Sequence, residues 1–151
     1  MSKKSKSRNK KHHQHRAQNH RELEELIKAC NNCLDVGYVS FHGLVKLYVE
    51  GNYRTHVDAA KLSPVEDYIK SAQADLRSLE KDLKELTVIA RDTIKNYISP
   101  EDNIVSSIDL HQRFEDWTTS YQTSVTPTLL ELSDYLDTLN PANKSVETEH
   151  E

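Results

Sequence analysis

The stretch that decides the fold runs from residue 63 to residue 90 and reads SPVEDYIKSAQADLRSLEKDLKELTVIA. Ser63 suits the N-cap of a helix, Pro64 suits the first helical position and Glu66 completes a capping box. Apolar residues then alternate spacings of four and three, the heptad pattern of a left-handed coiled coil. The pattern predicts a long helix over about residues 64–98, with heptad residues Val65, Ile69, Ala72, Leu76, Leu79, Leu83, Leu86 and Ala90.

A second start signal of the same kind lies at residues 99–102, which read SPED. Proline disfavours continuation of the preceding helix and suits the first turn of the next one. We therefore expect a returning helix over about residues 100–122, which forms an antiparallel hairpin with the long helix. Thr126 and Pro127 give a third start signal, so a final helix is expected over about residues 127–139, ended by Pro141.

The N-terminal third predicts two shorter helices. Apolar residues at helical spacing indicate a first helix over about residues 19–35, stopped by Gly37. A second helix over about residues 40–50 would be capped by Ser40 and closed by Gly51. A strand over residues 36–41, which read VGYVSF, is the competing interpretation. Residues 52–62 are compatible with a short helix or with an ordered connection.

The composition supports an all-α fold. Apolar residues make up 36% and charged residues 29% of the 151 residues, which suits helices that each bury one stripe. Three glycines and four prolines leave little material for turns between strands. We expect an elongated helical bundle that contains a long heptad-patterned antiparallel hairpin. The expected segments are a disordered basic arm (1–18), a short-helix segment (19–62), the hairpin plus final helix (63–139) and a flexible tail (140–151).

Charge is divided sharply along the chain. Eight of the 20 Lys and Arg residues lie in residues 1–21, which hold no Asp or Glu. The other 12 basic residues and all 24 acidic residues give residues 22–151 a charge of −12. A basic arm on an acidic body predicts binding of nucleic acid through phosphate contacts. The predicted nucleic-acid-binding residues are Lys3, Lys4, Lys6, Arg8, Lys10, Lys11, Arg16 and Arg21. An acidic protein or another polyanion is the competing ligand.

Two groups of side chains carry further predictions. Leu76, Leu79, Leu83 and Leu86 on the heptad seam, with Phe114, Trp117 and Tyr121, are predicted to form a protein interface, and a homo-oligomer is expected. Core packing is the competing interpretation of the three aromatic residues. Cys30 and Cys33, together with His15 and His20, are weak candidates for a zinc site, against core packing of the two cysteines.

No catalytic pattern accompanies these features. The sequence has no Gly-rich phosphate loop and no nucleophile elbow, and its carboxylates suit solvated helix faces. We expect a protein that is not an enzyme and uses no cofactor. It also lacks an apolar run long enough to span a bilayer, which favours an intracellular, cytoplasmic location, nuclear in a eukaryote or in the virion of a virus.

The expected function is that of a non-enzymatic helical interaction or assembly protein, tethered to nucleic acid or another polyanion by its basic arm. Phage and viral assembly proteins offer an analogy of architecture for such a protein. One alternative is a helix-turn-helix-like DNA-binding module at residues 20–60, dimerised by the long helices. A second alternative is an acidic inhibitor that occupies a basic surface of another protein.

Overall fold

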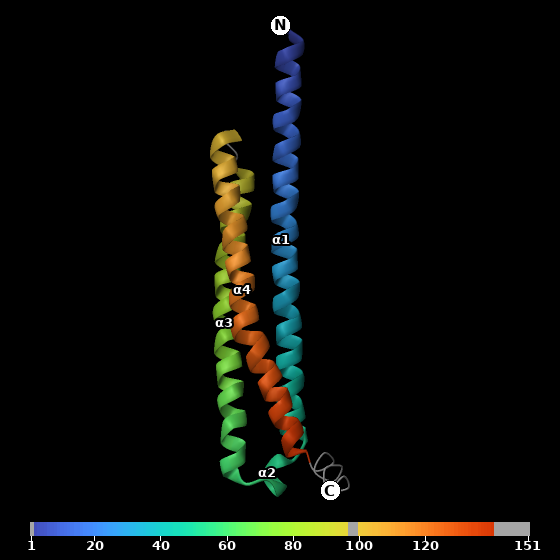
Figure 1. Cartoon of the computed structure of the whole chain (residues 1–151), viewed down its shortest axis with the longest axis vertical. Coiled ribbons are helices and arrows are strands. Elements are labelled where there is room, and N and C mark those ends of the chain that lie inside the picture. Colours follow the sequence, from blue (N-terminus) through green and yellow to red (C-terminus); the bar gives the residue numbers. More distant parts are fainter. Residues whose placement is uncertain (1, 97–99, 141–151) are drawn as a thin grey trace. The chain divides into compact units, whose positions relative to one another are not determined.

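The computed structural model describes the backbone of residues 2–96 and 100–140, and the side chains of residues 20–96 and 108–140. It contains four helices: α1 (Ser2–Glu50), α2 (Tyr53–His56), α3 (Ala59–Lys95) and α4 (Pro100–Leu139) (Figure 1). No strand occurs in these ranges, so the predicted all-α class is confirmed. The predicted flexible tail lies outside the described residues from residue 141 onward.

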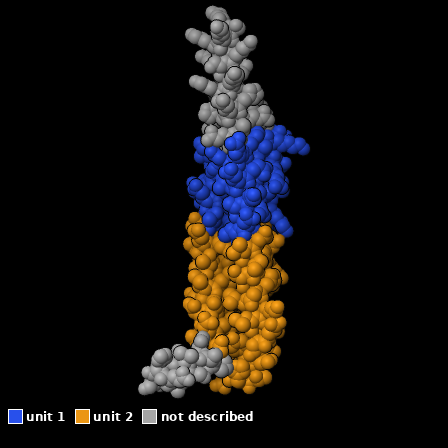
Figure 2. Space-filling view, turned by 90° about the vertical axis from the view of Figure 1, so that its right-hand side faces the viewer, with its two compact units in different colours: residues 1–33, 81–118 blue, residues 34–80, 119–151 orange. Residues whose placement is uncertain are grey.

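The chain forms two compact units (Figure 2). Unit 1 comprises residues 1–33 and 81–118, and unit 2 comprises residues 34–80 and 119–151. Within each unit, α3 runs in the opposite direction to α1 and α4 (Figure 1). Each unit gathers segments of all three long helices that lie far apart in the sequence. Periodicity along one stretch of chain does not predict such a division.

The prediction of two N-terminal helices separated near Gly37 is wrong, because α1 continues without a break through this residue. The competing strand over residues 36–41 is wrong for the same reason. Gly37 serves close packing: a Cβ atom added there would lie 2.5 Å from the Tyr121 hydroxyl oxygen and 3.1 Å from Leu76 Cδ2. Its backbone φ is not positive, so this glycine does not end the helix.

The break comes later, at Gly51 and Asn52. The Gly51 amide donates to the Leu47 carbonyl at 2.9 Å, and Asn52 adopts the left-handed conformation with φ 54°. Asparagine tolerates this conformation better than most residues. The Thr55 hydroxyl then donates to the Asn52 carbonyl at 2.6 Å and holds the short α2. Of the two interpretations of residues 52–62, the short helix is confirmed.

Two prolines that were expected to start helices lie inside them instead. Pro64 falls within α3, which begins at Ala59, and Pro127 falls within α4. The predicted starts at residues 64 and 127 are therefore wrong, whereas the start of α4 at Pro100 is confirmed. Each internal proline removes one helical hydrogen bond. Fully buried valines at positions 65 and 125 lie beside the two prolines, so packing continues across both sites and stabilises the helices there.

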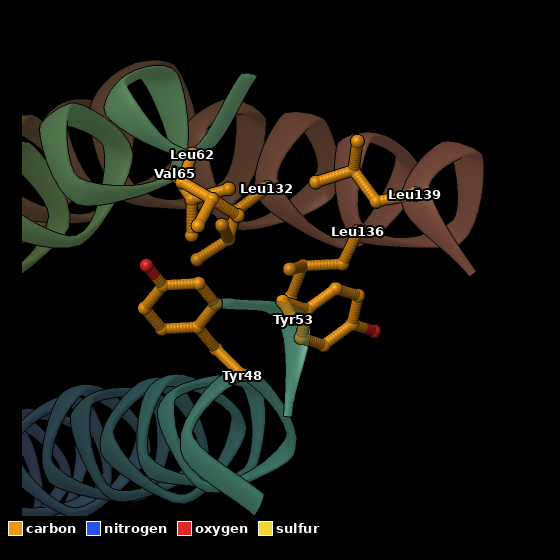
Figure 3. Close-up of a cluster of buried hydrophobic side chains, with 7 residues drawn as sticks. All are labelled: Tyr48, Tyr53, Leu62, Val65, Leu132, Leu136 and Leu139. Carbon is orange, nitrogen blue, oxygen red and sulfur yellow. The ribbon is translucent and has the colours of Figure 1, made fainter. Parts of the chain in front are cut away.

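One apolar cluster forms the core of unit 2 next to α2. Two tyrosine rings, those of Tyr48 and Tyr53, stack with their centroids 6.0 Å apart. Leucine and valine side chains from α3 and α4 cover these rings (Figure 3). The Tyr135 hydroxyl donates to the Lys61 carbonyl at 2.5 Å and adds a polar link between α4 and α3. The buried members of the cluster are Tyr48, Tyr53, Leu62, Val65, Leu132, Leu136 and Leu139.

Alanine substitutions at two helical glycines are expected to act in opposite directions. Gly37→Ala should lower the free energy of unfolding by about 1–3 kcal/mol, because its Cβ overlaps Tyr121. Gly43→Ala should raise it by about 1 kcal/mol, because its Cβ meets nothing within 4 Å and alanine favours the helix. Urea unfolding at low protein concentration measures both changes. Equal effects of the two substitutions would contradict the continuous α1.

Removing the Tyr48 hydroxyl is expected to stabilise the protein. The residue is only 7% exposed, and its hydroxyl oxygen has no hydrogen-bond partner in the described part of the chain. A buried polar group without a partner costs about 1–3 kcal/mol, so Tyr48→Phe should raise the free energy of unfolding by about 1 kcal/mol. Tyr135→Phe is the matched control. It removes a hydroxyl that does donate and should therefore lower the same quantity.

Candidate interaction surfaces

Most of the predicted nucleic-acid-binding residues fall outside the described side chains. The exception is Arg21, which is exposed on α1. The helix α1 begins at Ser2, so the predicted disorder of residues 1–18 is not confirmed. Among the described side chains, the first buried one along the chain is Leu23, which is 2% exposed and follows Arg21 by two residues. The basic arm and the packed body therefore meet within one turn of α1.

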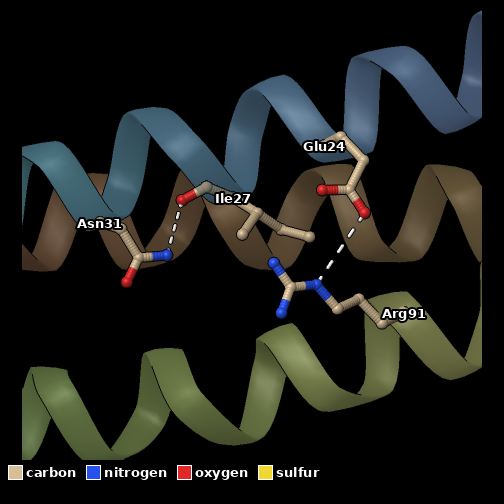
Figure 4. Close-up of polar contacts among 4 residues, drawn as sticks. All are labelled: Glu24, Ile27, Asn31 and Arg91. Atoms are coloured by element: carbon tan, nitrogen blue, oxygen red, sulfur yellow. Dashed lines mark hydrogen bonds and ion pairs between the residues drawn. The ribbon is translucent and has the colours of Figure 1, made fainter.

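The first acidic residues of the chain face a histidine and an arginine of the other two helices in unit 1. Glu22 Oε2 lies 3.5 Å from His111 Nε2 on α4. Glu24 Oε1 lies 3.9 Å from Arg91 Nε on α3 (Figure 4). The Asn31 amide donates to the Ile27 carbonyl at 2.8 Å on the same helix. Partly exposed ion pairs contribute at most about 1 kcal/mol each. The two contacts join α1 to α3 and to α4 within unit 1.

The predicted protein-interface residues lie in the interior of the two units. Exposed fractions range from 0% at Leu76 and Phe114 to 8% at Leu86 and Tyr121. Core packing, the competing interpretation of the aromatic residues, describes their observed positions. A contact between chains through these side chains stays a prediction. Such a contact would require the helices to separate, because the side chains are buried. Leu76, Leu79 and Tyr121 belong to unit 2, and Leu83, Leu86, Phe114 and Trp117 belong to unit 1.

Tyr38 and Glu80 link α1 to α3 in unit 2 through their side chains. The Tyr38 hydroxyl donates to Glu80 Oε2 at 2.6 Å. Burial of the hydroxyl, and then the hydrogen bond to the carboxylate, raise the pKa of Tyr38 to about 12. The protonated, neutral tyrosine is therefore the form that the folded protein favours.

This pKa has a consequence for stability at high pH. Because folding raises the pKa above its ordinary value of about 10, the contribution of Tyr38 is complete below about pH 10 and is lost as the pH rises through about 12. The difference in tyrosinate absorbance between the natural chain and Tyr38→Phe should titrate with a midpoint near pH 12. Circular dichroism at each pH verifies that the chain is folded. A midpoint near pH 10 in the folded protein would contradict the Tyr38–Glu80 bond.

The candidate zinc ligands do not converge. His20 and Cys30 lie ten residues apart on one helix, which separates them by about 15 Å along its axis. Cys30 is buried beside Thr118, with 3.7 Å between the sulfur and the hydroxyl oxygen, and burial raises the pKa of this thiol. His15 lies outside the described side chains. In the described part of the chain, no group of three or more metal-ligating side chains comes together.

Sequence patterns missed one surface, which we call the outer face of α1: Val36, Val39, Ser40, Gly43 and Leu47 in unit 2. Val36 is 63% exposed, Val39 72% and Leu47 49%. The two valines were interpreted only through their preference for strands. A detectable signal exists, since α1 carries this second apolar stripe beside the buried stripe of Leu34, Phe41 and Tyr48.

Comparison of the chain with protein-family models, with curated proteins and with solved structures found no match. Among the described residues, no helix combines the length and the apolar character needed to cross a membrane.

Proposed function

We propose that this protein is a non-enzymatic helical interaction protein, tethered to nucleic acid by its basic N-terminal arm. The observation that carries the proposal is the division of charge. Residues 1–21 hold eight cationic side chains and no carboxylate, whereas residues 22–151 have a formal charge of −12. The arm attracts a polyanion and the body repels it, so binding is confined to one end of the sequence.

The composition of the arm supports contact with phosphates rather than with bases. Residues 1–21 contain no Phe, Trp or Tyr on which bases could stack. Binding would therefore be driven mainly by release of counterions from the nucleic acid, with little preference for sequence. Eight phosphate contacts set an upper limit of about 7 for the decrease in log affinity per unit of log salt concentration.

The acidic residues nearest the arm have partners elsewhere, which supports the same proposal. Glu22 and Glu24 lie beside His111 and Arg91 of unit 1. These contacts orient both carboxylates toward α3 and α4. Less of the arm's positive charge is then neutralised by its own chain, and more remains available for an external polyanion.

The test uses the full-length chain with six cations of the arm replaced: Lys3, Lys4, Lys6, Arg8, Lys10 and Lys11, each to Gln. Fluorescence anisotropy with a labelled DNA duplex and with an RNA oligomer, across a salt series, measures the affinity. The natural chain should bind with a steep salt dependence. The variant should lose most of that slope, from an upper limit of about 7 to about 2, because two cations of the arm remain.

A matched control separates the arm from net charge. In the control, six exposed lysines of the body are replaced by Gln, which changes the formal charge by the same amount. The six residues are Lys28, Lys61, Lys70, Lys81, Lys84 and Lys95. The control should bind nucleic acid as the natural chain does. Equal losses in the two variants, or no binding by the natural chain near physiological salt, would overturn the proposal. The latter result would favour an acidic protein as the ligand of the arm.

A further inference from the structure

The outer face of α1 is an uncharged surface in a strongly charged protein. Its residues, Val36, Val39, Ser40, Gly43 and Leu47, span about three turns of α1 within unit 2 and face away from α3 and α4. Exposed valines are common singly, but a helical stripe of them is typical of a surface that another helix covers.

Gly43 gives a second, independent indication. Glycine in the interior of a helix is less favourable than alanine by about 1 kcal/mol. At Gly37 packing within the chain explains the glycine, because Tyr121 occupies the space that a Cβ atom would need. At Gly43, apart from the adjoining residues and backbone of its own helix, no atom of the described residues lies within 4 Å of the position of a Cβ, so packing among these residues does not explain the glycine. A bare backbone in the middle of an apolar stripe allows a second helix to approach closely.

The charges beside the outer face indicate which helix that is. Asp35 and Lys46 are exposed on the edge of the face that is nearer α3, and neither has an ion-pair partner among the described residues. They lie eleven residues apart, which is about three turns, so both are on the same edge. When two identical helices pair in antiparallel orientation, the same edge of each copy meets. Asp35 of each copy then lies opposite Lys46 of the other.

We propose that the outer face of α1 binds the outer face of a second copy of this chain, in an antiparallel arrangement with two-fold symmetry. In this arrangement Asp35 lies opposite Lys46 of the second copy. The same register places Gly43 opposite the space between Val36 and Val39 of that copy. The valines of each chain thus pack against Gly43 of the other chain, in the manner of knobs-into-holes packing.

This inference deepens the protein-contact part of the proposed function and does not depend on the arm. The two proposals can fail separately, because self-association is measured without nucleic acid. One helix face is smaller than the roughly 800 Å² per partner of a standard interface, so the dimer should be weak, with a dissociation constant in the micromolar range. A parallel pair would place Asp35 and Lys46 against the opposite, uncharged edge.

Sedimentation equilibrium of the full-length chain over a concentration series is the first measurement. The natural chain should show a monomer–dimer equilibrium. Val39→Glu should weaken dimerisation about a hundredfold, because the two new carboxylates meet near the two-fold axis. Leu130→Glu, at an exposed leucine of α4 in the same unit, is the matched control and should leave the equilibrium unchanged. Val39 is 72% exposed, so both variants should fold, as circular dichroism would verify.

Charge reversal tests the antiparallel orientation. Asp35→Lys and Lys46→Asp should each weaken dimerisation about tenfold, since each creates two like-charge contacts. Mixing the two variants should restore association, because both contacts between unlike chains become attractive. The double variant should also associate as the natural chain does.

Disulfide formation tests the register. In a Cys33→Ala background, Ser40→Cys should give a disulfide-linked dimer on mild oxidation, because the two copies of residue 40 lie within about one residue of the axis. Leu47→Cys should not, because its two copies lie about 20 Å apart along the axis. The proposal is overturned by a natural chain that stays monomeric, by a dimer insensitive to Val39→Glu, or by charge reversals that mixing does not rescue.

Discussion

The close approach of three helices at Gly37 is the constraint on which the packing of unit 2 depends. A methyl group there would overlap the Tyr121 hydroxyl and touch Leu76, so α1, α3 and α4 can converge only because this position lacks a side chain. One residue further along α1, Tyr38 reaches Glu80 at 2.6 Å. A wider separation of α1 from α3 would break this bond.

The sequence predicts the class of fold and the buried stripe of the long helix, but it places several helix boundaries wrongly. Pro64, Pro127 and Gly37 have the local chemistry of starts and stops. Each nevertheless lies inside a helix, because buried side chains on both sides continue the same apolar stripe, as Val125 and Leu129 do around Pro127. Local sequence rules consider the free energy of one hydrogen bond or one dihedral angle. The stability of a helix in a folded protein depends mainly on the packing of its whole apolar face.

Prediction of functional residues meets a similar limit. The heptad leucines and Trp117 were candidates for an interface because a sequence shows which residues are apolar but not which partner covers them. In the structure they are buried in the interior of each unit. Of the metal candidates, His20 and Cys30 are about 15 Å apart along α1, because residues close in sequence are spread along a helix. The charge division between residues 1–21 and the rest is a property of the sequence itself, and it needs no fold to be recognised.

Gly37 and Gly43 show why side-chain contacts are needed to interpret a glycine. Both lie in the interior of the same helix, six residues apart, and local sequence assigns both the same cost relative to alanine. What differs is the space around the missing Cβ: Tyr121 fills it at Gly37, and no described residue packed against the helix fills it at Gly43. The cost at Gly37 is offset by packing inside unit 2. In the proposed dimer, an equivalent offset at Gly43 comes from a second molecule, and Val36, Val39 and Leu47 of the outer face supply apolar surface for that contact.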